Sequence, residues 1–293
     1  MKIGFIGLGI MGKPMVKNLL KAGREVLAYY IIAENVENVV SAGAKGATSI
    51  AEVAKSCELI ITMLPNGPEV KQVVLESDFL DHVKEGTILA DMSSIAPAVA
   101  QEISAECAKK GVKMLDAPVS GGEPKAIDGT LSIMVGGEQD VFDKVYDIFL
   151  NMGATAVLCG DIGAGNTTKL ANQIIVALNI AAVSEAFMLS TKAGVDPEKV
   201  FDAIKAGLAG STVLNAKAPM IMDGNFNPGF KVDLHIKDLA NALETGHKVG
   251  SPLPFTAAIM EVMQYLKAQG LGQNDHSAVA KYYETLTGLQ IRK

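Results

Sequence analysis

Lys169 is the residue whose type and surroundings best suit proton transfer. It stands near the start of a long apolar segment, and Asn172 and Gln173 follow it three and four residues later. In a helix these three residues share one face. Burying a lysine is costly unless it is paired or used, and burial lowers its pKa, which suits exchange of a proton with a reacting oxygen. By itself, the position fits a helix-end lysine whose charged group reaches water even better.

A serine followed by two glycines forms a second candidate site, Ser120-Gly121-Gly122, directly after an apolar run. Glycines allow consecutive backbone N–H groups to converge on an anion. The carboxylate of a small substrate is the natural guest of such a turn. A purely structural turn is the alternative, but the absence of a nearby hairpin pattern favours anion binding.

The first twelve residues contain the dinucleotide-binding spacing G-x-G-x-x-G. It follows a predicted strand, opens a predicted helix, and comprises Gly7, Leu8, Gly9, Ile10, Met11 and Gly12. In such a motif the first glycine permits a tight turn and the second lets the backbone approach a pyrophosphate. The third lets the helix pack on the strand, and the helix N-terminus faces the phosphates. In this context the motif predicts NAD or NADP as the cofactor.

Residues 25–35, EVLAYYIIAEN, contain the second predicted strand and the residues that follow it. At the end of this strand an acidic residue normally binds the 2′-hydroxyl of the adenosine ribose. Tyr30 occupies the acid's position, and Ile31 follows where an arginine would hold a 2′-phosphate. Asn35 remains able to bond the ribose. With no acid and no cation in place, we expect weak discrimination between the two cofactors, within roughly tenfold, and NADH slightly ahead.

Two further segments end predicted strands and should face the cofactor, because ligands bind outside the carboxyl ends of parallel strands. They are Met63-Leu64-Pro65 and Asp91-Met92-Ser93-Ser94. Their hydroxyl groups would be available to the nicotinamide ribose or carboxamide. Ser94 fits almost equally well as a cap for the helix that begins near Pro97.

Composition excludes several classes of protein. The net charge of −6 argues against a nucleic-acid-binding surface. Three scattered cysteines and the four histidines, His82, His235, His247 and His276, have no metal-ligand spacing, so we expect no metal and reduced thiols. No signal peptide is expected, and residues 174–183 form too short an apolar run to span a bilayer. Together these features predict a cytoplasmic protein without a membrane or nucleic-acid partner.

These candidate residues need two domains to position them. Residues 1–162 alternate short apolar runs with helical segments, which predicts a Rossmann domain with a doubly wound parallel sheet. Residues 163–293 predict an all-α domain for substrate binding and oligomerisation, joined to the first by a helix of roughly 28 residues. Asp196 is a candidate N-cap for the next helix, with Pro197 in its first turn. Because the long helix is apolar nearly all round, we expect it to be buried on most sides, between domains or subunits.

The motifs together resemble the β-hydroxyacid dehydrogenase family over essentially the whole chain. The segments that carry the resemblance are GFIGLGIMGKPM, DMSS, DAPVSGGEPKAIDGTLSIMVGG, GDIGAGNTTKLANQ and FKVDLHIKDLANAL, in this order. Within the family, SGGEPKAIDGTLS, KLANQIIVALNIAA and GLAGSTVLNAKAPM are most similar to the subgroup that reduces tartronate semialdehyde (2-hydroxy-3-oxopropanoate) to D-glycerate. The family's fold, a Rossmann domain followed by an all-α domain, agrees with the pattern of elements.

The resemblance implies a role for each candidate. Lys169 would be the catalytic acid/base, and Ser120, Gly121 and Gly122 would bind the substrate carboxylate. Asn172, with Gln173, would orient the substrate and the lysine. Lys237 would lie near the cofactor and Asp238 near the substrate, with Phe230 packed close by. Relatives often carry a second asparagine where Gln173 stands and an Asp-Arg pair where Tyr30-Ile31 stands.

The resemblance therefore implies an NAD(P)-dependent oxidoreductase acting on a small carboxylated aldehyde. The long apolar helix favours a homodimer or homotetramer. Methylmalonate semialdehyde (the reaction of 3-hydroxyisobutyrate dehydrogenase), succinic semialdehyde and glyoxylate are rival substrates, because one or two methylene groups change specificity by only ~1–3 kcal/mol. A dinucleotide-binding scaffold without catalysis is the alternative from another class, since a fold alone does not fix an activity.

Overall fold

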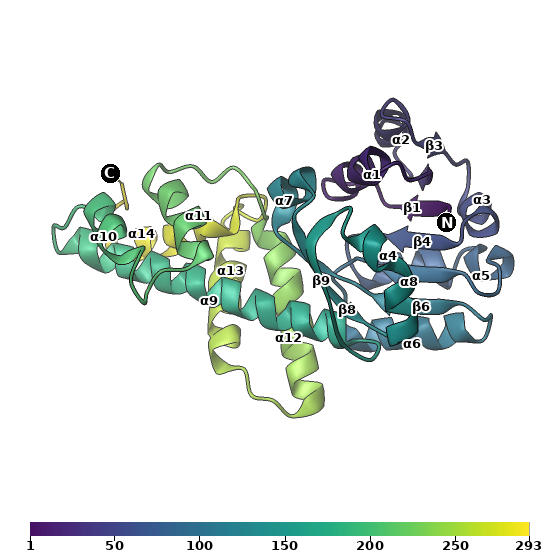
Figure 1. Cartoon of the computed structure of the whole chain (residues 1–293). Helices are drawn as coiled ribbons and strands as arrows, with labels where there is room; N and C mark the ends of the chain where they lie inside the picture. The colour runs from purple at the N-terminus through teal and green to yellow at the C-terminus, as the bar shows by residue number, and fades with distance from the viewer. Residues whose placement is uncertain (293) are drawn as a thin grey trace. The chain divides into compact units, whose positions relative to one another are not determined.

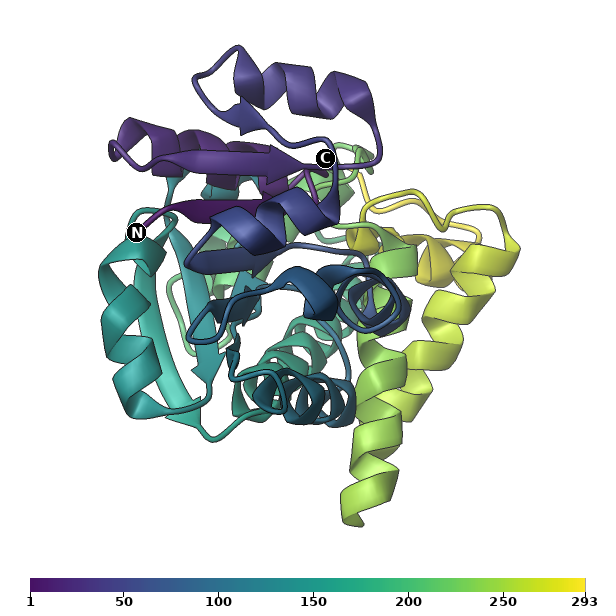
Figure 2. The ribbon, with the colours of Figure 1, turned by 90° about the vertical axis from the view of Figure 1, so that its right-hand side faces the viewer.

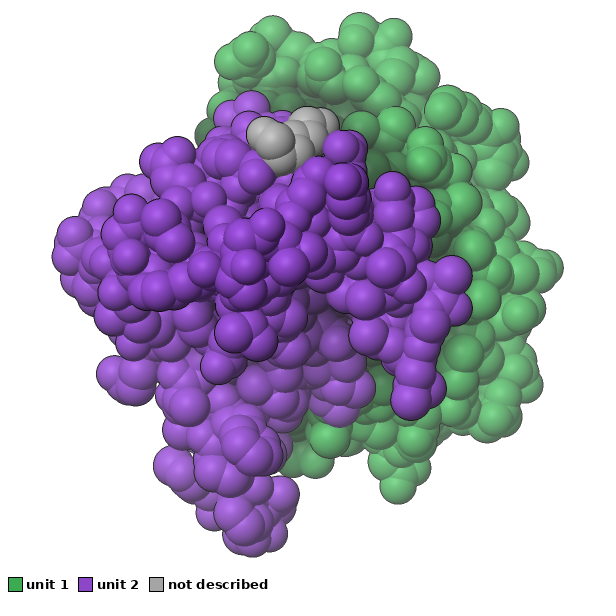
Figure 3. All heavy atoms as spheres, turned by 90° about the vertical axis from the view of Figure 1, so that its left-hand side faces the viewer, with its two compact units in different colours: residues 1–169 green, residues 170–293 purple. Residues whose placement is uncertain are grey.

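The computed structural model describes residues 1–292, and its contacts divide the chain into two compact units, Met1–Lys169 and Leu170–Lys293 (Figure 3). The division falls inside one helix, seven residues after the boundary at residue 162 that the sequence predicted. Figure 1 shows the order of elements along the chain. The first unit contains the sheet, and the second is built of helices.

The first unit contains one nine-stranded sheet in the order β3-β2-β1-β4-β5-β6-β8-β7, with β9 paired to β8. Neighbours from β3 to β6 are parallel, and β8 pairs with β9 in parallel. β8 runs antiparallel to both β6 and β7. The strands are β1 (Ile3–Ile6), β2 (Val26–Tyr29), β3 (Lys45–Gly46), β4 (Leu59–Thr62), β5 (Ile88–Asp91), β6 (Lys113–Asp116), β7 (Val119–Ser120), β8 (Leu131–Gly136) and β9 (Gly153–Gly160).

The predicted Rossmann class is confirmed, but the sheet is mixed where the sequence predicted a parallel one. The short β7 returns the chain against β8, so the last strands reverse direction. β3 and β7 have only two residues each, and such short strands leave no periodic pattern to detect. The short apolar runs that predicted the Rossmann domain form the seven strands β1, β2, β4, β5, β6, β8 and β9.

Helices cover both faces of the sheet, and the strands divide their side chains between two cores. Phe5 and Ile61 belong to one buried cluster, whereas Ile6 and Ile60 belong to the other. This alternation is what a sheet buried on both faces requires. Figure 2 shows α8 beside β9 on one face. The helices of this unit are α1 (Gly12–Lys21), α2 (Ala33–Val40), α3 (Ile50–Ser56), α4 (Gly67–Val74), α5 (Phe79–His82), α6 (Pro97–Ala108), α7 (Gly122–Asp128) and α8 (Gln139–Phe149).

The long predicted helix is α9, Ala164–Lys192, with 29 residues. By length and composition alone it is long and apolar enough to cross a membrane, and 28% of its most apolar 18 residues are buried. The sequence had singled out only the ten residues 174–183 within it. The expected burial on most sides is not found in the single chain, because Ile175 is 61% exposed and Leu189 73%.

The second unit packs its helices around one apolar cluster that contains Phe187, Leu214, Leu239 and Met263. Asp196 caps α10 as predicted, accepting a hydrogen bond from Glu198 N. Ser211 caps α11 in the same way through Leu214 N. The elements are α10 (Pro197–Ile204), α11 (Thr212–Met222), α12 (Val232–Val249), α13 (Pro254–Ala268), the 3-10 turn η1 (His276–Ala278) and α14 (Val279–Thr287).

Candidate active site

The glycine-rich turn has the backbone that a dinucleotide needs. Gly7 has a φ of +106°, and a Cβ atom there would overlap the carbonyl group of Met63. A Cβ at Gly12 would overlap the carbonyl oxygen of Gly7, whereas nothing lies within 4 Å of the corresponding position at Gly9. α1 begins at Gly12, and no side chain caps it. The turn is therefore closed where the strand meets the helix and open at Gly9, so these residues fit a pyrophosphate group.

The ends of β4 and β5 are joined by side-chain hydrogen bonds. Thr62 Oγ1 donates to Asp91 Oδ1 at 2.8 Å, and Leu64 N donates to Ser93 Oγ at 2.9 Å. The segment Met63-Leu64-Pro65 is thus held beside the segment that contains Ser94. The sequence predicted no role for Asp91, and it offered the hydroxyl group of Ser93 to the cofactor, whereas in the structure this hydroxyl is buried and accepts the bond from Leu64.

Ser94 does not cap the following helix, which contradicts one of its two predicted roles. The N-cap residue of α6 is Ala96, and no side chain caps that helix.

Asp91, three residues before Ser94, is fully buried, and this burial raises the pKa of its carboxyl group to about 6. The hydrogen bonds from Ser93 and Thr62 act in the opposite direction, because they favour the carboxylate.

Asp116, at the end of β6, holds the start of α9. Its Oδ1 accepts a hydrogen bond from Gly163 N at 2.7 Å, and its Oδ2 accepts from Asn166 N at 2.7 Å. Asn166 Oδ1 in turn accepts from Ile95 N at 3.0 Å. Burial raises the pKa of Asp116 to about 6, although these hydrogen bonds favour its charged form. The sequence gave no sign of this role, because the partners lie about 50 residues away along the chain.

Two glycines allow α9 to begin against the sheet. A Cβ on Gly165 would lie close to the carbonyl oxygens of Asp116 and Met134, and a Cβ on Gly136 would press on Asp161 and Gly165. The backbone of the first turn of α9 therefore lies directly on the ends of β6 and β8. Lys169 follows one turn later in the same helix, with only 6% of the residue exposed.

The candidate carboxylate-binding turn has a backbone that requires glycine. Ser120 ends β7, Gly121 has a φ of +136°, and Gly122 has a φ of +68°. Both angles lie in the left-handed region that side-chain-bearing residues avoid. Ser120 is partly buried. The geometry suits converging N–H groups, and the role in carboxylate binding remains a prediction.

Gln173 connects the two helices that carry the other predicted residues. Asn172 Nδ2 donates to Gln173 Oε1 at 2.9 Å, and Gln173 Nε2 donates to Asp238 Oδ2 on α12 at 2.5 Å. Lys237 Nζ lies 3.1 Å from Asp238 Oδ1. Gln173 and Asp238 are buried, at 4% and 1% exposure. Four of the predicted residues thus form one polar chain within the second unit.

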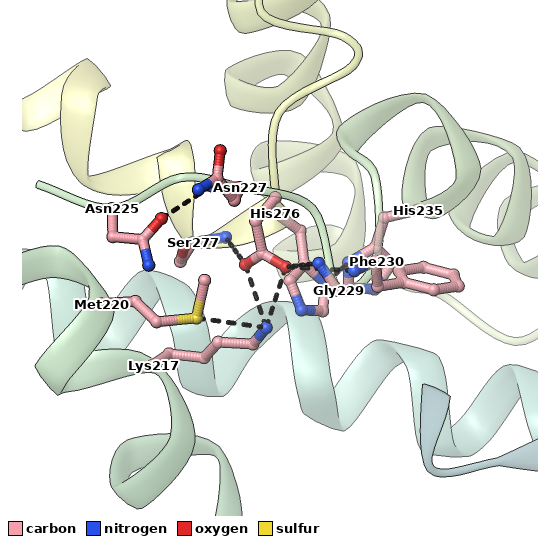
Figure 4. A network of polar contacts seen from close by, with 10 residues as sticks. Lys217, Met220, Asn225, Asn227, Gly229, Phe230, His235, His276 and Ser277 are labelled. Atoms are coloured by element: carbon pink, nitrogen blue, oxygen red, sulfur yellow. Dashed lines mark hydrogen bonds and ion pairs between the residues drawn. The ribbon is translucent and has the colours of Figure 1, made fainter. Parts of the chain in front are cut away.

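A buried pair of histidines supports the same part of α9 (Figure 4). His235 Nε2 lies 3.1 Å from the carbonyl oxygen of Gln173, and His235 Nδ1 lies 2.9 Å from His276 Nδ1. A carbonyl oxygen only accepts, so Nε2 of His235 carries the proton. The Nδ1 of a neutral His235 then accepts, and Nδ1 of His276 donates. The sequence had treated both residues only as surface or core histidines.

Asp275 anchors this cluster through five bonds. It pairs with Lys217 Nζ at 2.9 and 3.0 Å and accepts hydrogen bonds from the backbone N–H groups of Gly229, Phe230 and Ser277. Burial alone would raise the pKa of Asp275, but His276 and Lys217 outweigh it and hold the pKa at about 2. Figure 4 shows Lys217 among the residues of this cluster, with dashed lines from its Nζ atom that include the two bonds to Asp275.

Phe230 packs against the histidine pair, with its ring centroid 5.7 Å from that of His235 and 5.4 Å from that of His276.

In the first unit, at the predicted ribose site, Tyr30 packs against the larger core cluster of the sheet, and Ile31 is 83% exposed. Asn35 Nδ2 donates to the carbonyl oxygen of Leu8 at 2.9 Å. Among residues 1–292, no group of three or more histidine, cysteine or acidic residues is arranged to hold a metal ion.

Two family models match the two parts of the chain. Residues 2–160 match the NAD-binding domain of 6-phosphogluconate dehydrogenase. Residues 163–283 match the domain described as NAD-binding of NADP-dependent 3-hydroxyisobutyrate dehydrogenase. The 2-hydroxy-3-oxopropionate reductase of Escherichia coli (strain K12) is 42% identical over 99% of this chain and all of its own length. The chain belongs to the β-hydroxyacid dehydrogenase family.

Other members of the β-hydroxyacid dehydrogenase family are similarly close. The 2-(hydroxymethyl)glutarate dehydrogenase of Eubacterium barkeri is 40% identical over 99% of this chain and 97% of its own. The Mycobacterium tuberculosis 3-hydroxyisobutyrate dehydrogenase structure with L-serine has a TM-score of 0.89 and 30% identity, covering 96% of this chain and 98% of that one. The protein is thus an NAD(P)-dependent β-hydroxyacid dehydrogenase.

Proposed function

We propose that this β-hydroxyacid dehydrogenase reduces tartronate semialdehyde to D-glycerate. The observation that carries the proposal is the 42% identity, over the full length, to the Escherichia coli 2-hydroxy-3-oxopropionate reductase. The motifs around Ser120, Lys169 and Lys217 are also most similar to the subgroup with that reaction. The bound nicotinamide supplies the hydride that reduces the aldehyde carbon.

In this proposal the chain's own residues provide proton transfer and orientation. Lys169 is buried on the first turns of α9 and donates a proton to the aldehyde oxygen. In the reverse direction its neutral form takes the proton from the alcohol. The N–H groups of the turn at Ser120, Gly121 and Gly122 bind the carboxylate. Asn172, fixed by Gln173, orients the lysine and the substrate.

The alternative substrate is 2-formylglutarate, the aldehyde formed by oxidation of 2-(hydroxymethyl)glutarate. It is considered because the Eubacterium barkeri 2-(hydroxymethyl)glutarate dehydrogenase is 40% identical over nearly the whole chain. In both candidate substrates, one carbon atom is bonded to the aldehyde group and to a carboxylate. They differ in the substituent on that carbon, which is a hydroxyl group in tartronate semialdehyde and a carboxyethyl group in the other. Pocket size on that side of the substrate therefore decides between them.

A panel of aldehydes tests the proposal, with consumption of NADH and NADPH followed in parallel. The panel contains tartronate semialdehyde, 2-formylglutarate, methylmalonate semialdehyde, succinic semialdehyde and glyoxylate. We expect the highest kcat/KM for tartronate semialdehyde. A higher value for another member would replace the proposed substrate, and no turnover with any of them would favour a non-catalytic scaffold.

A further inference from the structure

Lys13 lies at the end of the sheet where the cofactor is expected to bind. The sequence analysis of the ribose site did not consider this lysine. Lys13 is the second residue of α1, and its Nζ lies 3.5 Å from Oδ1 of Asn35 on α2. The Asn35 side chain donates to the carbonyl oxygen of Leu8 through Nδ2. This bond fixes the amide so that Oδ1 faces the ammonium group. The glycine-rich turn, α1 and α2 therefore converge around one cation.

The place of this cation coincides with the ribose position of a Rossmann domain. The adenosine ribose lies where the second strand ends, beside the glycine-rich turn. β2 ends at Tyr29, and α2 begins at Ala33. Ile31, at the position where an arginine would hold a 2′-phosphate, exposes 83% of its surface to solvent. Lys13 is partly buried and reaches this region from α1.

The position of Lys13 is unfavourable in a helix without an anion nearby. The N-terminus of a helix carries a partial positive charge, so a cation in the first turn is repelled. Lys13 stands in that first turn, and α1 has no acidic residue there. Glu34 in the first turn of α2 is exposed, where water and salt screen its charge. A bound phosphate would supply the missing negative charge.

We propose that Lys13, oriented by Asn35, binds the 2′-phosphate of NADPH and determines cofactor choice. The inference rests on the assignment to the NAD(P)-dependent family but not on the identity of the aldehyde. It replaces the basis for the slight preference for NADH, which was the absence of a cation at this site. The protein is then expected to bind NADP⁺ at least as tightly as NAD⁺.

Calorimetric titration with NADP⁺ and NAD⁺, without any aldehyde, tests the proposal. Lys13→Gln should raise the Kd for NADP⁺ at least tenfold, the loss expected for one charge-assisted hydrogen bond, and change the Kd for NAD⁺ by less than about threefold. Lys13→Arg should retain most of the affinity for NADP⁺. Raising the salt concentration should weaken NADP⁺ binding more in the parent than in Lys13→Gln.

Lys21→Gln is the matched control, because it removes the same charge from the exposed last turn of the same helix. It lies about 12 Å further along the axis, at 1.5 Å per residue, and should leave both affinities unchanged. Equal weakening of NADP⁺ and NAD⁺ by Lys13→Gln would place the lysine on the shared pyrophosphate and overturn the proposal. So would unchanged binding of NADP⁺. Because no aldehyde is present, these outcomes are independent of the proposed substrate.

Discussion

At the scale of single residues, buried polar groups carry the proposed chemistry. Lys169, Gln173 and Asp238 are each less than 10% exposed, yet they have polar or charged side chains. Such groups are costly to bury, so each must be paired or used. Gln173 Nε2 donates a hydrogen bond to Asp238 Oδ2, and Lys169 is the proposed proton donor.

Replacing Lys169 with alanine should lower kcat by at least ~100-fold, the lower end of general acid–base contributions, while NADPH still binds. Lys169→Arg should be almost as impaired, because arginine keeps the charge but does not release a proton. Stopped-flow turnover and a separate titration of cofactor binding distinguish the two effects. Near-native turnover in Lys169→Ala would show that another group transfers the proton.

Ser120→Ala should raise KM for the carboxylated aldehyde much more than for a neutral analogue of similar size. The reason is that the serine and the glycine N–H groups after it are assigned to the carboxylate. Steady-state kinetics with both aldehydes provide the comparison. A similar rise in KM for both would remove the assignment of this turn to the carboxylate.

At the scale of elements, α9 links the sheet to the helical unit, and its start is fixed by backbone contacts. Asp116 bonds the N–H groups of Gly163 and Asn166, and Gly165 lies against carbonyl oxygens of β6 and β8. The position of Lys169 on the helix therefore depends on residues that take no part in the reaction.

Gly165→Ala should destabilise the first unit by about 1–3 kcal/mol, because the added methyl group meets rigid backbone and forces it to move. It should also reduce kcat by displacing the turn that precedes Lys169. Gly9→Ala is the control for stability, since nothing lies within 4 Å of its Cβ position. It should leave the free energy of unfolding nearly unchanged and weaken cofactor binding instead. Equal stability of both variants would contradict the packing argument.

The anchor at Asp275 predicts a dependence of stability on pH. Its folded pKa of about 2 lies below the ordinary value of 3.8, so the carboxylate adds stability above about pH 4 that is lost as the pH falls through about 2. Asp275→Asn should cost about 3 kcal/mol near pH 7, because Lys217 then keeps a partly buried charge without its partner.

Denaturant unfolding of the parent and of Asp275→Asn at several pH values measures the difference in their free energies of unfolding. It should shrink as the pH falls below about 4. Asp202→Asn is the control from the same unit, because Asp202 pairs with Lys205 at the surface with 62% of its side chain exposed. We expect a change below about 1 kcal/mol for it. A pH-independent cost of Asp275→Asn would show that its charge contributes nothing.

At the scale of the whole molecule, the exposed apolar side chains of α9 suggest a protein–protein interface. Ile175 and Leu189 are exposed in the single chain, on a helix whose opposite stripe contains the buried Ala177, Ile180 and Phe187. We propose that a second copy of the chain covers them, as a homodimer or part of a homotetramer. Exposed apolar surface of this kind is typical of protein–protein interfaces.

Light scattering after size exclusion should therefore give at least twice the 30.7 kDa mass of one chain. Ile175→Lys combined with Leu189→Lys should shift the population toward the single chain, because charges would be buried in the interface. Leu208→Lys, at a fully exposed position outside the helices, should leave the mass unchanged. An unchanged oligomer in the double variant would place the interface elsewhere.

Much of this protein was determined by local sequence patterns. Apolar runs and glycine positions predicted the longer strands of the sheet, the glycine-rich turn and the long helix, because these features depend on the backbone within a few residues. The cap at Asp196 was predicted for the same reason, as it acts two residues along the chain. The motifs also gave the family and the candidates Lys169, Ser120 and Asn172.

The remaining features depend on residues far apart in sequence, which only the tertiary structure brings together. The reversed direction of β8, the bond of Asp116 to the start of α9, and the pair His235–His276 depend on contacts across tens of residues. Lys13 approaches Asn35 across 22 residues, so a search for a cation directly after β2 could not find it. Local propensity determines the elements, but long-range packing decides which side chains meet.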